Sequence, residues 1–306
     1  MECILITGGA GFIGSHSAER LLAAGQAVRV FDDFSSGRRA NLPSHPQLEI
    51  VTGDIRDLAA VERSMAGCSR VLHLAAQVSV RASVEAPCDS ASRNLTGFLN
   101  VLDAARRLGI GRLVYASSAA VYGQPRDLPL DEQSPVQPVS PYGLEKLIND
   151  QYAALFGSLY GLSCLGLRYF NVYGPRQDPH SPYAGVLSKF TDRLRQGQGL
   201  TVFGDGEQTR DFIYVKDVAE FNHRALFSEH SGVLNVATGH SRSLNSVITV
   251  LGSILGRAPE VTLAPRPEGD IVHSASRNDA LTAALGTHDF VALEQGLRRL
   301  LEAGAS

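Results

Sequence analysis

The sequence predicts an α/β protein in which a doubly wound parallel sheet is followed by a smaller C-terminal α/β domain. Three observations predict this fold class. Short apolar runs alternate with helix-like stretches, a glycine-rich turn follows the first run, and loops rich in proline and glycine begin near residue 170. With 306 residues and 44% apolar content, the chain is long enough to bury one large core or two modest ones.

Five apolar runs alternate with four helix-like stretches in the first half of the chain. The runs lie near 3–6, 27–31, 48–51, 70–75 and 112–116, and the helix-like stretches lie near 12–24, 57–66, 92–108 and 144–160. Strands separated by helices predict a parallel sheet with helices on both faces. A further run at 163–168 predicts another strand.

The domain boundary is expected near residue 170, where the strand pattern gives way to the proline- and glycine-rich segment 171–182. We expect residues 1–170 to form the first domain, which a segment around 211–238 rejoins. Residues 171–306 are expected to form the smaller second domain, which binds the substrate.

The first apolar run leads into a glycine-rich turn at 7–14, and a helix-like stretch follows. Its glycines fit both G-x-G-x-x-G and G-x-x-G-x-x-G. Backbone without side chains lets a pyrophosphate approach the amides at a helix N-terminus, so the turn predicts a Rossmann-type dinucleotide site. The residues expected to contact the cofactor here are Gly8, Gly11, Phe12, Ile13 and Gly14.

The second apolar run ends in Asp32 and Asp33, eighteen residues past Gly14. This is close to where a dinucleotide fold places the acid that binds the adenosine ribose. Such an acid accepts hydrogen bonds from free ribose hydroxyls and repels a 2′-phosphate, so Asp32 predicts NAD rather than NADP. Arg38 and Arg39 could serve a phosphate, but their position past a Ser-Gly pair favours solvated loop charges.

Asp54 follows the third apolar run and has two interpretations. It could bind the adenine amine, together with the adjoining Ile55. Alternatively, it could be the N-cap of the helix that is expected to start near Leu58. The residues leave both interpretations open.

Other marked residues lie where strands are expected to end, and the ligands of such sheets bind beyond these ends. Leu74-Ala75-Ala76 follows the fourth run and Ser117-Ser118 closes the fifth, so we expect the serines to face the nicotinamide. Alternatively, the two serines are an ordinary helix cap. Asn94 could hold backbone geometry at the cofactor site or could only lie on the 92–108 helix.

Tyr142 and Lys146 are four residues apart, and Pro141 is expected to open their helix. Residues at i and i+4 share one helix face, so the phenol and the ammonium should point the same way. A tyrosine has an ordinary pKa of roughly 10, and a buried neighbouring cation lowers it. Tyr142 is therefore a candidate base near neutral pH. A surface helix with a chance Tyr and Lys is the alternative, which the glycine turn and the serines disfavour.

Composition argues against several other functions. The net charge of −3 with mixed signs gives no basic stripe, so nucleic-acid binding is not expected. Four separated cysteines show neither a disulfide framework nor metal-ligand spacing, and free thiols fit a reducing cytoplasm. No run approaches the roughly 18 apolar residues of a membrane span, and no leader precedes the glycine turn. We expect a soluble cytoplasmic protein without a metal.

Several motifs together make the chain similar to the extended short-chain dehydrogenases/reductases, and within them to the NDP-sugar epimerases. The resemblance runs nearly end to end. Its motifs are the glycine turn, Leu74-Ala75-Ala76, Ser117-Ser118 with the following Ala119-Ala120-Val121-Tyr122-Gly123, Tyr142 with Lys146, and the segments at 168–176, 204–212 and 266–270.

This resemblance implies residues for the substrate, a UDP-sugar. Asn171, Arg210 and Arg266 would hold the nucleotide diphosphate, and Asp270 the uridine ribose. The arginine fork suits phosphate oxygens, although surface ion pairing is the alternative for both arginines. Ser118 and Tyr142 would also touch the sugar, and Tyr169 would lie at the cofactor.

In the group that the chain resembles, the residues that follow the serine pair distinguish enzymes that catalyse different reactions. Dehydratases carry Thr/Ser-Asp-Glu, whereas Ser118 is followed here by Ala119 and Ala120. The Ser-Glu pair typical of UDP-glucuronate decarboxylases and epimerases is also absent. The resemblance thus implies a UDP-sugar 4-epimerase that works through a 4-keto intermediate with tightly bound NAD. A dehydratase, or a nucleotide-sensing relative without catalysis, is the alternative; such sensors commonly lose the Tyr/Lys pair.

In the same group, one position determines how large a sugar the enzyme accepts. Epimerases restricted to glucose and galactose have a tyrosine at the position aligned with Ser274, and its ring fills the space that an N-acetyl group needs. Ser274 therefore implies UDP-GlcNAc and UDP-GalNAc, with or without UDP-glucose and UDP-galactose. The chain departs from its relatives at Ser276 and Arg277, where Ala-Asp is common.

A homodimer is also implied, because the helices near 92–108 and 144–160 resemble those of a four-helix dimer interface in relatives. The first of these helices carries Arg93, Asp103, Arg106 and Arg107, which could equally face water.

Overall fold

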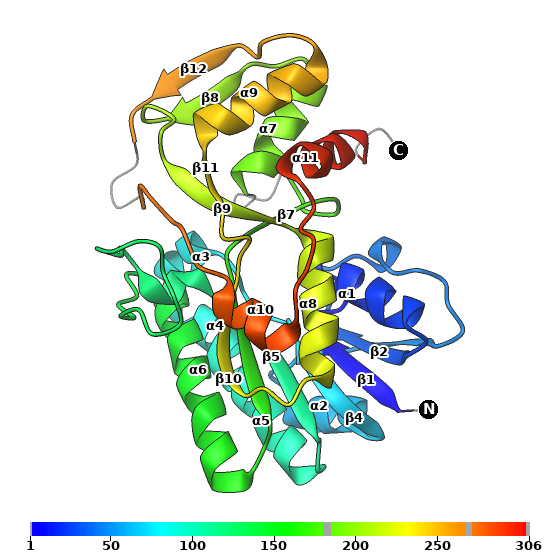
Figure 1. Cartoon of the computed structure of the whole chain (residues 1–306). Coiled ribbons are helices and arrows are strands. Elements are labelled where there is room, and N and C mark those ends of the chain that lie inside the picture. Colours follow the sequence, from blue (N-terminus) through cyan, green and yellow to red (C-terminus); the bar gives the residue numbers. More distant parts are fainter. Residues whose placement is uncertain (1, 180–184, 267–270, 304–306) are drawn as a thin grey trace.

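A parallel sheet of seven strands forms the centre of the larger body of the protein (Figure 1). The computed structural model describes residues 2–179, 185–266 and 271–303. The strand order is β10-β6-β5-β4-β1-β2-β3, and every pair is parallel. The strands are β1 (Cys3–Thr7), β2 (Ala27–Asp32), β3 (Leu48–Thr52), β4 (Cys68–His73), β5 (Arg112–Ser118), β6 (Cys164–Tyr169) and β10 (Gly232–Val236). The predicted doubly wound sheet is confirmed.

The strand order reverses beside β1, which pairs with β2 on one side and with β4 on the other. The chain first builds the sheet outward from β1 to β3 and then returns to β4. Such a reversal leaves a crevice beyond the carboxyl ends of the two central strands, where ligands of doubly wound sheets bind.

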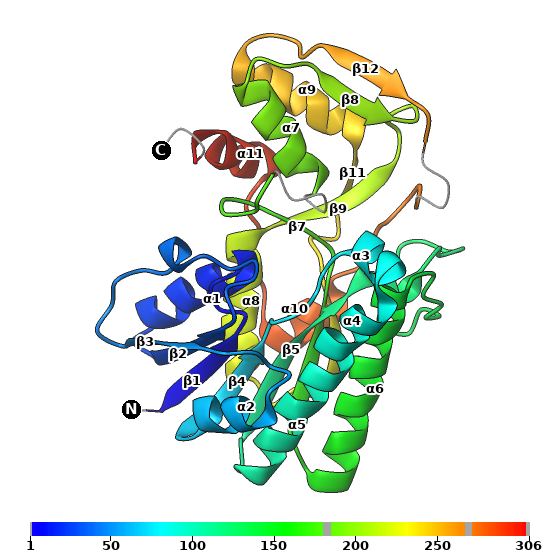
Figure 2. The same cartoon turned by 180° about the vertical axis from the view of Figure 1, so that it is seen from behind.

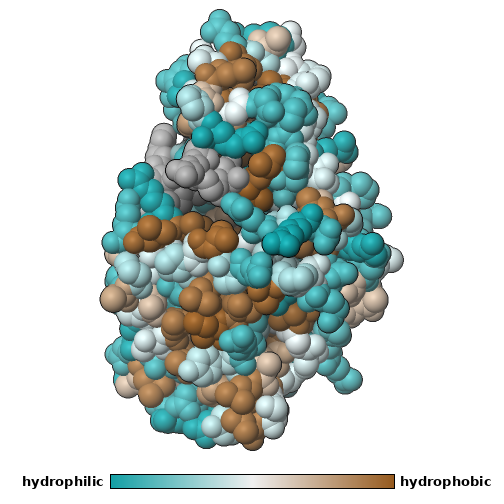
Figure 3. Space-filling model, turned by 90° about the vertical axis from the view of Figure 1, so that its left-hand side faces the viewer, coloured by the Kyte–Doolittle hydropathy of each residue, from teal (hydrophilic) through white to brown (hydrophobic). Residues whose placement is uncertain are grey.

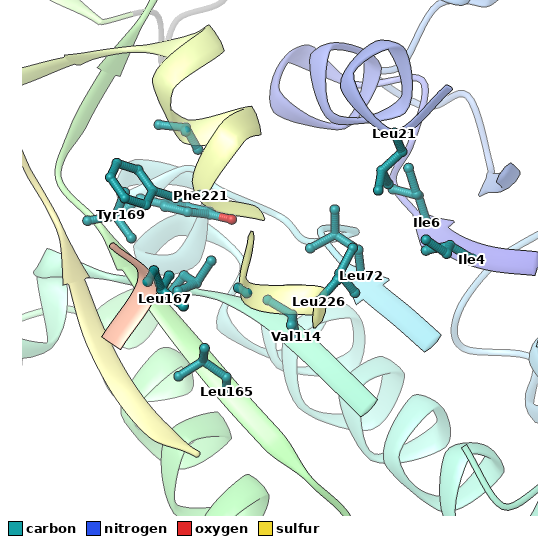
Figure 4. Packing of buried hydrophobic residues seen from close by; sticks show 14 of the residues in the cluster. Ile4, Ile6, Leu21, Leu72, Val114, Leu165, Leu167, Tyr169, Phe221 and Leu226 are labelled. Atoms are coloured by element: carbon teal, nitrogen blue, oxygen red, sulfur yellow. The ribbon is translucent and has the colours of Figure 1, made fainter. Parts of the chain in front are cut away.

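Burial on both faces explains why the central strands are apolar at consecutive positions. Successive side chains of a strand point to opposite faces. In β1, Ile4 and Ile6 pack into the hydrophobic cluster on one face, and Leu5 packs into the cluster on the other. Figure 4 shows Ile4 and Ile6 near Leu21 and Leu72, within the first of these clusters.

Helices cover both faces of the sheet, as the two opposite views show (Figures 1 and 2). Side chains of each helix enter the cluster on its own face. One face carries α1 (Phe12–Ala23), α8 (Val215–Phe227) and α10 (Asp279–Leu285), and the other carries α2 (Leu58–Met65), α5 (Gly97–Arg107) and α6 (Pro141–Tyr160).

The predicted helix near 92–108 is part of a longer helical run. It begins with α4 (Pro87–Ala91), passes through a π-helical turn at Ser92–Thr96 and continues as α5. A short helix, α3 (Val80–Glu85), precedes it. Two 3₁₀ turns, at Arg39–Asn41 and Ala119–Tyr122, follow the ends of β2 and β5.

A smaller body lies beyond the carboxyl ends of the central strands (Figure 1). A sheet in the order β11-β9-β7 and a two-stranded pair β12-β8 form it, with three helices. Its core includes Tyr173, Val202, Val247 and Leu297. The strands are β7 (Asn171–Tyr173), β8 (Leu200–Phe203), β9 (Thr209–Tyr214), β11 (Ser241–Ser243) and β12 (Val261–Ala264), and the helices are α7 (Val186–Arg195), α9 (Leu244–Leu255) and α11 (Leu293–Glu302).

Two segments return from the smaller body to the larger one. The first is α8 with β10, within the segment that was expected to return. The second is α10, whose Leu281 and Leu285 are buried in the core of the larger body. We expected the whole segment after residue 238 to stay in the second domain, but α10 packs on the larger body instead. The division near residue 170 itself stays a prediction.

Within the described ranges, no helix is both long and apolar enough to cross a membrane. The same residues bring no three His, Cys, Asp or Glu side chains together as metal ligands. The cysteines Cys3, Cys68, Cys88 and Cys164 are free thiols.

Candidate functional site

A cavity of about 1210 Å³ lies at the carboxyl ends of the parallel strands and reaches the smaller body. Its wall includes Gly8, Ala75 and Ser118 from the strand ends and Arg210 from β9. Pockets for one small molecule typically occupy about 300–1,000 Å³. The cavity therefore has room for a dinucleotide and a second ligand of nucleotide size.

The glycine turn brings the start of α1 to this cavity. Gly8 has φ +69°, and a Cβ there would lie 2.6 Å from the backbone nitrogen of Ala75; a Cβ on Gly14 would overlap the Gly8 carbonyl. Gly11 is the N-cap of α1, with no side-chain cap and no acidic residue in the first turn. Gly8, Gly11, Phe12, Ile13 and Gly14 all line the cavity. This helix end fits an anionic group such as a pyrophosphate.

Asp32 lies at the end of β2, buried beside the glycine turn. Its Oδ2 accepts a hydrogen bond from Ala10 N (2.9 Å), and its Oδ1 accepts one from Phe34 N (2.8 Å). Burial raises the pKa of Asp32, and these two hydrogen bonds oppose that rise. The carboxylate lines the cavity and keeps lone pairs for further donors, so it fits a ribose with free hydroxyls.

The two arginines after β2 both interact with groups of the protein. Arg38 forms an exposed ion pair with Asp178 (3.3 Å). Arg39 stacks on the Phe34 ring and donates to Thr52 Oγ1. These contacts agree with the interpretation of Arg39 as a loop charge, whereas Arg38 also lines the cavity, so both of its interpretations stay open.

Asp54 lines the cavity together with Ile55. Hydrogen bonds from the Arg56 side chain, one of them at 2.9 Å, lower the pKa of Asp54. The N-cap of α2 is Asp57, whose Oδ1 accepts from Ala60 N (3.1 Å). The alternative that Asp54 caps this helix is therefore wrong.

Ser118, at the end of β5, both caps a helical turn and faces the cavity, so both interpretations of this residue hold. Its hydroxyl accepts a hydrogen bond from Ala120 N (3.1 Å) and so caps the 3₁₀ turn. It also hydrogen-bonds the Tyr142 hydroxyl, which tends to lower the pKa of that phenol. Ser117 also lines the cavity but is almost fully buried. Of the two serines, Ser118 is thus the one beside Tyr142.

Tyr142 and Lys146 lie on the first turns of α6. Ser140 caps this helix by accepting from Gly143 N (3.1 Å), and Pro141 occupies its first turn, as predicted. Lys146 Nζ donates to Ala116 O (2.9 Å) and lies 5.9 Å from the centre of the Tyr142 ring. The two side chains share one face of the helix and both line the cavity.

The pKa of Tyr142 differs from the sequence expectation. Burial raises the pKa of Tyr142; the Ser118 hydrogen bond opposes this rise, and Glu145 adds to it. Burial also lowers the pKa of Lys146 to about 8, against the opposing charges of Asp150 and Glu145. Lys146 was expected to lower the pKa of Tyr142, and this expectation is wrong. Desolvation of the phenol dominates, and the Lys146 ammonium is directed at the Ala116 carbonyl.

A buried ion pair supports α6 from beneath. Asp150 Oδ2 accepts from Arg168 Nε (3.0 Å), and its Oδ1 accepts from the Tyr115 hydroxyl (3.1 Å). Arg168 also donates to the Tyr122 hydroxyl (2.9 Å). Burial raises the pKa of Asp150, while Arg168 acts to lower it. These bonds join α6 to β5 and β6 below the cavity.

Asn94 holds backbone geometry and does not line the cavity. Its Oδ1 accepts from Gln77 N and its Nδ2 donates to Gln77 O, both at 2.8 Å. Gln77 directly follows Leu74-Ala75-Ala76, and these three residues line the cavity at the end of β4. Asn94 lies in the π-helical turn, and its two hydrogen bonds to Gln77 fit the first interpretation rather than a residue that only lies on the helix. The expected contact of Asn94 with the cofactor is not supported, since the residue is not part of the cavity wall.

The residues expected to hold a UDP-sugar are only partly brought together. Asn171, Arg210 and Ser274 line the cavity, as does Tyr169. Backbone carbonyls hold the Arg210 guanidinium, including Ile271 O at 2.6 Å.

Arg266 lies apart from this set, outside the cavity wall. Its Nη2 pairs with Asp205 at 3.1 Å, so the ion-pair alternative describes its contacts. Asp270 lies outside the described residues.

Sequence reasoning missed residues that hold the site without lining it. Ser83 accepts a hydrogen bond from Tyr142 N (3.1 Å), and Glu145 is buried between Tyr142 and Lys146. On the cavity wall it missed Pro175, whose carbonyl lies 3.0 Å from His16 Nε2 on α1. Two signals in the sequence could have found some of these residues: the polar Glu145 inside the Tyr–Lys motif, and the place of Pro175 in the 168–176 motif.

This sheet, the uncapped glycine-rich helix start and the buried acid at the end of β2 define a dinucleotide-binding protein with an additional ligand-binding body. The model of the NAD-dependent epimerase/dehydratase family matches residues 4–237. The chain belongs to this family, and NAD is its cofactor.

Similar proteins span nearly the whole chain. The UDP-glucose 4-epimerase of Mycolicibacterium smegmatis is 38% identical over 309 residues, which covers 97% of each chain. The UDP-N-acetylglucosamine 4-epimerase of Methanobrevibacter ruminantium, solved with UDP-N-acetylmuramic acid, has a TM-score of 0.96 at 36% identity and covers 99% of this chain and 98% of its own. The UDP-glucose 4-epimerase of Thermus thermophilus, solved with NAD, has a TM-score of 0.90 at 40% identity and 98% coverage of both.

We expect Asp32→Ala to weaken NAD binding by roughly tenfold or more, because hydrogen bonds to a charged group are worth about 1.5–3 kcal/mol. The measurement is the NAD content of the purified protein together with calorimetric titration of NAD. Asp33→Asn is the matched control, since the Asp33 carboxylate accepts from Ser35 N within its own turn. Equal NAD affinity in Asp32→Ala and the parent would contradict the assignment of Asp32 to the ribose.

Proposed function

We propose that the protein is a UDP-sugar 4-epimerase. One observation carries this proposal most directly: Tyr142 lies half-buried at the cavity wall beside Ser118, with Lys146 on the same helix face. The whole-length similarity to proteins named as UDP-sugar 4-epimerases supports it.

The cofactor site follows from the strand ends. The backbone at Gly11 and Gly14 would hold the pyrophosphate, Asp32 the adenosine ribose, and Asp54 with Ile55 the adenine. Lys146 would hold the ribose next to the nicotinamide. Tyr169 and the residues 74–76 would form the wall around the nicotinamide end.

Tyr142 acts as the base. When bound, NAD would supply reversible transfer of a hydride from and to C4 of the sugar. Tyr142, as phenolate, takes the proton of the 4-hydroxyl, and Ser118 bridges the two oxygens. Because burial raises the pKa of Tyr142, this role requires the positive charge of Lys146 on the same helix face.

The diphosphate is held more firmly than the sugar. Arg210 lines the cavity with its guanidinium fixed by backbone carbonyls, and Asn171 lies on the same wall. A firm diphosphate and a loosely held 4-keto sugar let the sugar turn about its linkage, so that it presents its other face. Tyr142 then returns the proton to the 4-oxygen, and the configuration at C4 is inverted.

The sugars are most consistent with UDP-GlcNAc and UDP-GalNAc, with UDP-glucose and UDP-galactose as further substrates. The supporting residue is Ser274, whose small side chain is part of the cavity wall. The similarity to a UDP-N-acetylglucosamine 4-epimerase supports the same substrates.

A dehydratase of the same family is the second candidate. Elimination of water needs an acid next to the reacting sugar, whereas Ala119 and Ala120 occupy the cavity wall after Ser118. A nucleotide-sensing protein without catalysis is disfavoured because Tyr142 and Lys146 are both present.

Proton NMR of the purified protein with UDP-GalNAc or UDP-galactose, with no NAD added, tests the function. We expect conversion of each sugar to its 4-epimer. A keto-deoxy product would identify a dehydratase. No conversion, even after NAD is supplied, would overturn the proposal.

Tyr142→Phe should lower kcat for epimerisation by about 10²–10⁴, since this is the usual contribution of a positioned proton-transfer group. Circular dichroism and the thermal midpoint should stay close to the parent values. Tyr152→Phe, on the same helix but partly exposed, should leave kcat unchanged. Substantial activity in Tyr142→Phe would remove this residue from the role of base.

Ser274→Tyr should abolish turnover of UDP-GalNAc while UDP-galactose is still converted, because the ring would fill the space of the N-acetyl group. Ser274→Ala keeps the space and is the control, expected to convert both sugars. The ratio of kcat/KM for the two substrates is the measurement. An unchanged ratio in Ser274→Tyr would show that this side chain does not face the sugar.

We also propose a homodimer built on α6. Several of its apolar side chains are exposed, among them Leu155 at 47% and Leu159 at 61%. Figure 3 shows apolar side chains over the lower part of the face on the left of Figure 1, where α6 runs. Arg106 and Arg107 on the neighbouring α5 are engaged with Asp103 in ion pairs.

Replacing both Leu155 and Leu159 by Asp should convert the dimer into a monomer, because charge would have to be buried in an apolar contact. Light scattering after size-exclusion chromatography gives the mass. Leu263→Asp, at an exposed position of β12, is the control and should leave the mass unchanged. A parent protein that is monomeric would contradict the proposal.

A further inference from the structure

Glu145 carries a buried carboxylate that the proposed chemistry does not use. It lies on α6 between Tyr142 and Lys146, with 4% of its surface exposed. Its Oε2 accepts hydrogen bonds from Ser90 Oγ (2.8 Å) and Asn94 Nδ2 (2.6 Å), which are both neutral groups. Buried carboxylates are normally paired with a cation, because desolvation of an unpaired charge is costly.

The same carboxylate joins two parts of the site. Asn94 accepts from and donates to the backbone of Gln77, which follows the cavity-lining residues 74–76 at the end of β4. Glu145, through Asn94, therefore ties the helix of Tyr142 and Lys146 to this strand end.

The charge of Glu145 also acts on both neighbours. Its charge raises the pKa of Tyr142, which adds to the effect of burial. After the larger effect of Asp150, it also raises the pKa of Lys146, which opposes the effect of burial. Both effects have one physical cause, since a negative charge stabilises the protonated form of either group.

Other titratable groups around Tyr142 and Lys146 are compensated or neutral. On β4, burial and Lys146 lower the pKa of His73 to about 3, so its ring is uncharged at neutral pH. Asp150, one turn after Lys146, is paired with Arg168 of β6.

The charged side chains of α3 and α4, which pack against α6, form ion pairs. Asp89 on α4 pairs with Arg93 of the π-helical turn. On α3, Arg81 pairs with Glu85, and both side chains are exposed. Glu145 is thus the uncompensated charge next to the Tyr–Lys pair among the described residues.

We propose that Glu145 is a positioning residue of the site: its carboxylate fixes α6 to the end of β4 through Asn94 and, together with Asp150, keeps Lys146 positively charged beside Tyr142. This role rests on the proposed epimerase function. It makes the working pH range of the enzyme a property of a residue that touches neither substrate nor cofactor.

Glu145→Gln tests the proposal, because the amide keeps the size and one acceptor oxygen but removes the charge. Without the charge, both Tyr142 and Lys146 lose their protons at lower pH. We expect both limbs of the pH profile of kcat for UDP-galactose to move toward lower pH, with KM, NAD content and thermal midpoint close to the parent values. Glu85→Gln is the matched control and should leave the profile in place.

A loss of kcat at every pH without movement of the limbs would reduce Glu145 to a structural role and overturn the proposal. Glu145→Ala separates the two parts of the role, because it also leaves the Asn94 amide without its acceptor. We expect it to show the same shift together with a loss of retained NAD. NAD retention equal to that of Glu145→Gln would overturn the link to β4.

A second readout does not depend on turnover. The ultraviolet difference spectrum between the parent and Tyr142→Phe reports ionisation of Tyr142, and the same pair is measured in the Glu145→Gln background. We expect Tyr142 to ionise at lower pH without the carboxylate, and coincident titrations would overturn the proposal. A parent protein that converts no UDP-sugar but shows this shift would refute the epimerase function and leave the role of Glu145 standing.

Discussion

The close approach of Gly8 to the end of β4 is the constraint on which the rest of the structure depends. A Cβ on Gly8 would lie 2.6 Å from Ala75 N, and the positive φ of this residue further restricts the position to glycine. This contact sets the N-terminus of α1 against the carboxyl ends of the central strands. Since those ends also carry Asp32 and Ser118, the glycine turn, Asp32 and Ser118 come together in one cavity.

Burial then gives the site its chemical character. Desolvation acts in opposite directions on the two key groups, because it raises the pKa of Tyr142 and lowers the pKa of Lys146 to about 8. Each shift disfavours the charged form that proton transfer needs. The carboxylates of Glu145 and Asp150 counter this for Lys146, and Arg168 balances Asp150 in turn. The role proposed for the Tyr–Lys pair therefore depends on a larger set of buried charges.

The smaller body is held to the larger one by buried polar contacts at the crossing segments. Asp211 on β9 is fully buried and accepts hydrogen bonds from the backbone N–H groups of Thr238, Gly239 and His240. These three residues connect β10 of the large sheet with β11 of the small one. The neighbouring Arg210 is fixed by carbonyls from the 271–272 segment. A rigid anchor for a diphosphate is consistent with a reaction in which only the sugar has to turn.

Local sequence determined the sheet, the glycine turn, the acid at the end of β2 and the shared face of Tyr142 and Lys146. Each of these features depends on the period of apolar residues along the chain or on the spacing of residues within one helix, strand or turn. The tertiary structure alone decided that Arg266 pairs with Asp205, that α10 packs on the larger body and that Asp57 rather than Asp54 caps α2. It also decided the direction in which the pKa of Tyr142 shifts and the hydrogen bond between Glu145 and Asn94. Burial and contacts between distant segments set these features, and no local pattern of residues encodes either.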